Sequence, residues 1–117
     1  MCKSALVFNN SPVFYRLENK KLVKRATGHE WADWYEAAAQ SGARVVARDE
    51  LDGGLIISTI FTGLDGCAID TAPELFETMM LLNGKSTGVA LRSETWQQAE
   101  SQHRRMARQA READKDA

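Results

Sequence analysis

Apolar positions along the chain follow two patterns, and the commoner one is a short run closed by turn-forming residues. Runs rich in β-branched and aromatic residues, such as VFYRL at 13–17, are typical of strands. Asp52-Gly53-Gly54 and Asn83-Gly84 each stand between two such runs, and a glycine after Asp or Asn favours a tight hairpin turn. The pattern therefore predicts two hairpins over residues 44–92 and a meander of two or three strands over residues 4–25.

The second pattern repeats an apolar residue every three or four positions and predicts two helices, at 28–41 and 95–113. Thr27 and Glu30 have the spacing of a capping box, in which each side chain accepts the backbone N–H of the other residue. Gly42 follows the first helix as a left-handed C-cap. The second helix has an apolar face made of Trp96, Ala99, His103, Met106 and Ala110.

This order of elements predicts an α+β fold, an antiparallel sheet of about five to seven strands with two helices packed on one face. With 117 residues the chain fits one domain over 1–117, with a frayed tail after the second helix. The eleven residues at 63–73 are expected to form a loop between the two hairpins.

Composition narrows the class of protein. The chain is 44% hydrophobic and 26% charged, as in ordinary soluble domains. It has no apolar run near the ~20 residues of a membrane helix and no signal-peptide pattern at the N-terminus, so we expect a cytoplasmic protein that does not bind membranes. Cys2 and Cys67 have no metal-ligand or redox spacing and are predicted to be free thiols. We expect no metal and no cofactor.

Two carboxylates form the first candidate site. Asp65 follows one predicted strand and Glu77 lies in the next, and two carboxylates ~5 to 10 Å apart can perform acid–base chemistry. A small hydrolase using this pair is therefore one hypothesis. The structural interpretation is favoured, with Asp65 as a turn former and Glu77 either facing solvent or paired across strands with Arg92 or Arg48.

Other catalytic patterns are missing from the sequence. His29 and His103 are single helix residues, and the chain has no nucleophile elbow, Walker loop or dinucleotide-binding motif. We therefore name no catalytic residue, and the sequence leans away from an enzyme without excluding one.

Charge is unevenly distributed. Residues 28–82 hold ten acidic residues against two arginines, and residues 1–27 hold six basic residues against one acid. An anionic surface that docks on a basic protein is one interpretation, and ordinary surface charge is the other. The candidate contacts with a protein partner are Glu30, Asp33, Glu36, Asp49, Glu50 and Asp65.

The C-terminal helix carries an arginine cluster without an intervening acid. Such a cluster can follow nucleic-acid phosphates, although a solvated helix face is the simpler interpretation. The candidate residues are Arg104, Arg105, Arg108 and Arg111.

Three strings in the chain are similar to motifs of a known family. ISTIFTGLD, PELFETMMLLNG and SETWQQAESQH resemble the pattern STVFxGxD, LFETM and TxxEAxxxH of small bacteriophage and prophage proteins without an assigned activity. WADWYE at 31–36 corresponds to a W-x-x-W-F-E helix of the same family. The family usually has a glycine before the histidine where Gln102 precedes His103 here, so the resemblance does not carry over a role for His103.

The resemblance implies a viral or mobile-element origin and gives no mechanism. Small phage accessory proteins commonly act by binding a host protein, which is an analogy at the level of the class. Our leading hypothesis is therefore a non-enzymatic accessory protein that binds and inhibits a host protein complex, such as a counter-defence inhibitor of the anti-CRISPR kind. The alternative is a nucleic-acid-binding accessory protein that uses the arginine-rich helix. Both a monomer and a homodimer remain open.

Overall fold

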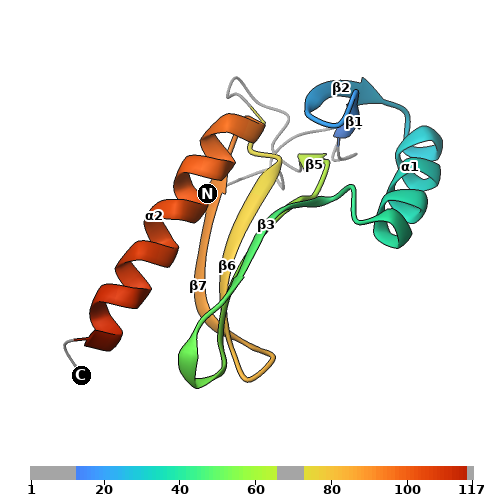
Figure 1. Cartoon of the computed structure of the whole chain (residues 1–117). Helices are drawn as coiled ribbons and strands as arrows, with labels where there is room; N and C mark the ends of the chain where they lie inside the picture. Colours follow the sequence, from blue (N-terminus) through green and yellow to red (C-terminus); the bar gives the residue numbers. More distant parts are fainter. Residues whose placement is uncertain (1–12, 66–72, 116–117) are drawn as a thin grey trace, which may run out of the picture.

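The structure is a computed structural model that describes residues 13–65 and 73–115 (Figure 1). The predicted strand at 4–8, both cysteines and most of the predicted loop lie outside these ranges. The elements in chain order are β1 (Val13–Glu18), β2 (Leu22–Ala26), α1 (Gly28–Ser41), β3 (Val45–Glu50), the 3-10 turn η2 (Asp52–Gly54), β4 (Leu55–Phe61), β5 (Leu64–Asp65), β6 (Phe76–Leu82), β7 (Lys85–Ser93) and α2 (Trp96–Lys115).

The strands form two antiparallel sheets, one of order β2-β1-β5 and one of order β3-β4-β6-β7. This confirms an α+β fold of antiparallel strands. The expectation of one sheet with both helices on one face is corrected, because the described strands divide between two sheets. Helix α2 lies across all four strands of the larger sheet, whereas α1 packs against β1 and β2 (Figure 1).

Gly63 explains why the strands separate into two sheets. Its φ of +71° is in the left-handed region that favours glycine, and a Cβ here would lie 2.6 Å from the indole nitrogen of Trp31. The turn directs Leu64 and Asp65 to β1, where Asp65 pairs with Val13. Asp65, expected in a loop, is therefore part of a short strand.

Both hairpins of the larger sheet form where the turn residues predicted them. Asn83 and Gly84 have φ values of 52° and 83°, the pair of positive values that a two-residue type I′ turn requires. Their neighbours Leu82 and Lys85 begin the β6–β7 pairing. The β3–β4 hairpin closes through η2, which contains Gly53 and Gly54.

The predicted caps of α1 are also confirmed. The Thr27 hydroxyl accepts the backbone N–H of Glu30 at 3.1 Å, and the Glu30 carboxylate accepts the N–H of Thr27 at 2.8 Å. The hydrogen bond from the Thr27 backbone lowers the pKa of Glu30 below its usual value. Gly42 ends the helix at φ 82°. Local sequence therefore sets both ends of this helix.

Aromatic side chains connect the two helices through the end of the larger sheet. Trp34 of α1 contacts Phe61 with ring centroids 5.4 Å apart, and Phe61 contacts Phe76 at 5.1 Å. Phe76 in turn meets Trp96 at the start of α2, at 6.2 Å. Leu17 of β1 joins the same cluster, so this core holds the smaller sheet, α1 and the larger sheet together.

The two faces of the larger sheet have different surroundings. We call the side packed against α2 the covered face; it carries Ile57, Thr59 and Phe61 of β4 and Phe76, Thr78 and Met80 of β6. The open face is the other side, with Ile56, Ser58 and Ile60 of β4 and Glu77, Met79 and Leu81 of β6. Among the described residues no helix or strand packs across the open face (Figure 1).

Candidate functional site

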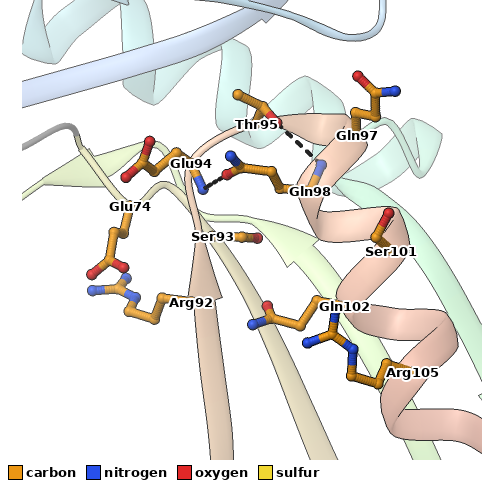
Figure 2. A pocket seen from close by; sticks show the side chains of 10 residues that line it. All are labelled: Glu74, Arg92, Ser93, Glu94, Thr95, Gln97, Gln98, Ser101, Gln102 and Arg105. Carbon is orange, nitrogen blue, oxygen red and sulfur yellow. Dashed lines mark hydrogen bonds between the residues drawn. The ribbon is translucent and has the colours of Figure 1, made fainter.

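A groove lies between the end of β7 and the first turns of α2 (Figure 2). Two capping hydrogen bonds hold these elements together: Thr95 accepts the N–H of Gln98, and the Gln98 side chain accepts the N–H of Glu94, both at 3.1 Å. The groove has a volume of about 690 Å³ and is lined by Glu74, Arg92, Ser93, Glu94, Thr95, Gln97, Gln98, Ser101, Gln102 and Arg105.

The groove is polar, with charges of both signs. Gln102 and Arg105 extend from α2 toward β7, while Glu74 and Arg92 point toward one another on the far side of the strand (Figure 2). Ser93 is buried, and its hydroxyl oxygen and the amide oxygen of Gln102 have no hydrogen-bond partner within the described protein. A buried polar group without a partner costs about 1–3 kcal/mol, so these two oxygens are positions where water or a ligand can donate a hydrogen bond.

Strand β7 beside the groove is an exposed edge. Eight of its nine residues are exposed, including Val89 and Leu91, and among the described strands it pairs only with β6. The N–H of Phe61 donates to the carbonyl oxygen of Arg44, so the backbone groups of Phe61 point from β4 toward β3. Backbone N–H and C=O groups point to alternate sides of a strand from one residue to the next. When this alternation is followed through the β4–β6 and β6–β7 pairs, the N–H and C=O groups of Ala90 and Arg92 point away from the sheet.

A second cluster of polar groups lies between α2 and the covered face. The hydroxyls of Thr78 and Thr59 are 2.8 Å apart, and Thr59 lies 2.8 Å from Nδ1 of His103. The other ring nitrogen, Nε2, is 3.3 Å from a carboxylate oxygen of Asp49, and Arg111 donates to the second oxygen at 2.8 Å. The hydrogen bond from Arg111 is the main reason that the pKa of Asp49 lies below its usual value.

This order of hydroxyl, imidazole and carboxylate resembles a nucleophilic triad, but access decides its role. Thr59 and Thr78 are 0% exposed and His103 is 3% exposed, so a substrate has no path to the hydroxyl. The cluster instead satisfies polar groups inside the core. His103 lies on the apolar side of its helix as the sequence indicated. Its partners Thr59 and Asp49 were missed, although alternation along β4 places Thr59 on the same face as Ile57 and Phe61.

The acidic candidates are spread over three elements. Glu30, Asp33 and Glu36 are exposed on α1, where Asp33 lies 3.4 Å from His29. Asp49 belongs to the buried cluster, and Glu50 lies 3.8 Å from Arg48 near the end of β3. Asp65 is on β5. Figure 1 shows α1 and this end of β3 in separate parts of the molecule.

The four arginines also divide. Arg111 is paired with Asp49 on the β3 side of α2, and Arg105 lines the groove on the β7 side. At about 100° per residue, Arg104 lies within about 20° of Arg111 around the helix, and Arg108 lies farther toward the side away from the sheet. Both Arg104 and Arg108 are exposed. They are four residues apart, about one helical turn, and therefore form one exposed basic strip.

The two residues of the candidate carboxylate pair lie in different sheets. Asp65 is on β5 in the smaller sheet, and Glu77 is on β6, where it is directly opposite Arg92. The cross-strand neighbour expected for Glu77 is therefore present. In the described part of the chain no group of three or more His, Cys, Asp or Glu is placed to hold a metal ion.

Comparisons of the chain with protein-family models, with curated proteins and with solved structures gave no match. Neither described helix has the length and apolar character needed to span a bilayer.

Proposed function

We propose that this protein binds a partner protein by adding an extended segment of that partner to the outer edge of β7. The observation that carries the proposal is the exposed edge strand with a polar groove between it and α2. In strand addition, backbone hydrogen bonds supply much of the affinity, and pockets beside the strand read alternate side chains.

Two residues of β7 offer backbone N–H and C=O groups to an added strand. Ala90 and Arg92 present N–H and C=O groups away from β6, at the place where the groove begins. An added antiparallel strand pairs with all four groups. Gly88, at φ 89°, and the register shift between Met79 and Leu81 interrupt the strand on one side of this stretch, so we expect a short added segment.

The groove determines which segment fits. Side chains of the added strand that point toward α2 meet the amides of Gln98 and Gln102, the hydroxyl of Ser101 and the guanidinium of Arg105. Arg105 is the cation on this wall, and a guanidinium binds a carboxylate in a forked geometry. We therefore expect a polar partner segment with an acidic side chain opposite Arg105.

The resemblance to bacteriophage and prophage proteins suggests the biological setting. In that setting the chain is an accessory protein in the host cytoplasm, its partner belongs to a host complex, and occupation of the partner's segment inhibits that complex. A counter-defence inhibitor is one form of this proposal. The acidic side chains of α1 would be secondary contacts.

Affinity capture from the host with the tagged full chain tests the proposal. Ala90→Pro removes an outward donor and leaves the β6 pairing, and Arg105→Glu reverses the charge on the α2 wall of the groove. Arg108→Glu is the matched control, because it makes the same charge change on the outward side of α2. We expect a host protein bound by the wild type and Arg108→Glu and lost with the first two variants, all folded by circular dichroism. Capture that survives both changes, or no specific host protein at all, contradicts the proposal.

A second candidate function rests on Arg104 and Arg108. They are exposed, and no ion pair forms at either one among the described residues, so both are available to phosphates. Binding to DNA or RNA that weakens with salt and is lost in a triple variant of Arg104, Arg105 and Arg108 would support this alternative. Lack of retention on either nucleic acid at low salt would remove it.

A further inference from the structure

The open face of the larger sheet is a second surface, which shares Arg92 with the groove. Half of the twelve residues that the register places on it are apolar. The register places three rows of residues across it. Glu50, Ile56, Leu81 and Ser86 form the first row, Arg48, Ser58, Met79 and Ala90 the second, and Val45, Ile60, Glu77 and Arg92 the third.

The centre of this surface resembles the inside of a sheet sandwich. Ile56 and Ile60 of β4 and Met79 and Leu81 of β6 are half-buried, and Val45 at one corner is 43% exposed. An antiparallel sheet with one face in water usually alternates apolar and polar residues, so that the water-facing side is polar. These strands are apolar at most positions of both faces, which is typical of a sheet packed on both sides.

The charges around the apolar centre favour one kind of partner over another. Arg48 and Glu50 stand on one edge strand, and Glu77 and Arg92 stand near the other. The face is therefore neutral, with charges of both signs at its rim. A host surface of one sign has no electrostatic advantage here, whereas a face with balanced charges is complementary to itself under a suitable rotation.

The corners define that rotation. Glu50 and Arg92 occupy diagonally opposite corners of a patch three strand spacings wide and about four residues long, which is roughly 14 Å in each direction. A two-fold axis along the other diagonal, from Val45 to Ser86, exchanges these corners. It brings Glu50 opposite Arg92 of a second copy and crosses the strands of the two sheets near 90°, one of the established packings of sheets.

We propose that the open face binds the open face of a second copy of this chain, forming a two-fold dimer with Glu50–Arg92 pairs at two corners. Met79 and Ser58 lie at the centre of this arrangement. The groove lies at the outer edge of β7, so the dimer presents two grooves and can bind two partner segments. The dimer does not depend on the function proposed for the groove.

The area of the open face determines the affinity that we expect for the dimer. Two faces that cross near 90° overlap over about four strand spacings in each direction, roughly 19 Å by 19 Å, which gives about 360 Å² of flat area per copy. Two such faces total about 720 Å², which is below the range of stable specific interfaces and in that of weak, transient ones. We therefore expect a reversible dimer with a micromolar dissociation constant.

Sedimentation velocity of the full chain over a series from 1 to several hundred micromolar, roughly the range that brackets such an affinity, is the first test. We expect the wild type to shift from monomer to dimer across this series. Met79→Arg places a charge at the centre and should weaken dimerisation at least about tenfold. The control Gln109→Arg, on the exposed side of α2, should leave it unchanged.

A charge exchange tests the geometry. Glu50→Arg alone and Arg92→Glu alone each place like charges at both corners and should weaken the dimer. The double variant Glu50→Arg with Arg92→Glu restores opposite charges and should recover the wild-type dissociation constant within about threefold. Thermal melts of dilute protein establish that each variant is folded.

Four outcomes overturn the proposal. A dimer that Met79→Arg does not weaken, or that the double variant does not recover, has a different interface. A monomer at all concentrations whose melting temperature drops sharply with Met79→Arg indicates that another part of the same chain covers the face. A monomer whose melting temperature is unaffected leaves the face to a different protein.

Discussion

The two faces of the larger sheet are built from alternate residues of the same strands, yet one is covered by α2 and the other is not covered by any described helix or strand. On β4, Ile57, Thr59 and Phe61 face α2 and are buried, while Ile56 and Ile60 face the other way and are half-buried. Both sets are largely apolar. The comparison shows that apolar alternation identifies the residues that share a face, whereas the covering of that face depends on other elements or other molecules.

Polar groups sharpen the contrast. The covered face contains a hydrogen-bonded chain from Thr78 through Thr59 and His103 to Asp49. The open face has its charges at the rim and apolar residues at the centre. A buried polar group needs a hydrogen-bond partner, whereas an exposed rim charge can also pair with a charge on a second molecule.

The largest loss of stability should come from truncating a side chain on the covered face. Phe61→Ala removes a ring that is 0% exposed and contacts both Trp34 and Phe76, so we expect the free energy of unfolding to fall by about 3–5 kcal/mol. Urea denaturation of dilute protein measures this loss.

The neighbouring residue on the open face is the matched control. Ile60→Ala should lower the free energy of unfolding of the dilute protein by about 1 kcal/mol or less, because the side chain is only half-buried. Equal losses for the two variants would mean that both faces are covered within one chain, which would contradict an open face.

An intermediate effect is expected from the buried hydrogen bonds. His103→Leu keeps an apolar side chain on the inner side of α2 but removes the partner of Thr59 and one partner of Asp49. We expect a loss of about 1–3 kcal/mol in the free energy of unfolding. Gln109→Leu, a similar change on the exposed side of the same helix, should remain within about 0.5 kcal/mol of the wild type. A His103→Leu protein as stable as the wild type would show that packing alone holds α2 on the sheet.

A smaller effect should appear in the pH dependence of the free energy of unfolding at acidic pH. The lowered pKa of Asp49 means that its carboxylate stabilises the folded chain at pH values above the unfolded pKa of about 3.9. This stabilisation is lost as the pH falls through the lower folded pKa. Urea denaturation between about pH 5 and pH 2 should therefore show a weaker pH dependence for Asp49→Asn than for the wild type. Arg111→Gln, which removes the main cause of the shift, should also weaken it, and an unchanged slope in both variants would contradict this role of Asp49.

The local parts of the fold were predictable because local chemistry determines them. The Thr27–Glu30 box and Gly42 fix the ends of α1, and Asn83-Gly84 fixes the β6–β7 turn. Each feature needs residues only a few positions apart, which a pattern along the chain displays directly.

The division into two sheets was not predictable in the same way. It depends on the contact of Gly63 with Tyr15 and Trp31, residues more than thirty positions away, and alternation contains no information about such partners. The candidate site has the same limit. In the sequence Asp49 cannot be distinguished from other surface acids, because only the fold brings His103 and Arg111 beside it. The groove requires β7 and α2 to be placed side by side, although the exposed run at 85–92 lies next to a helix start in the sequence.

The most direct test of the central claim, that one face of the sheet is covered and the other is available for binding, uses neighbouring methionines. Met79 is on the open face, Met80 is on the covered face, and Met106 of α2 is 5% exposed. A soluble paramagnetic agent in methyl NMR should broaden Met79 far more than Met80 or Met106 in dilute protein. Its effect on Met79 should then decrease as the protein concentration rises and the second copy binds. A Met79 methyl as protected as that of Met106 in dilute protein would contradict the account.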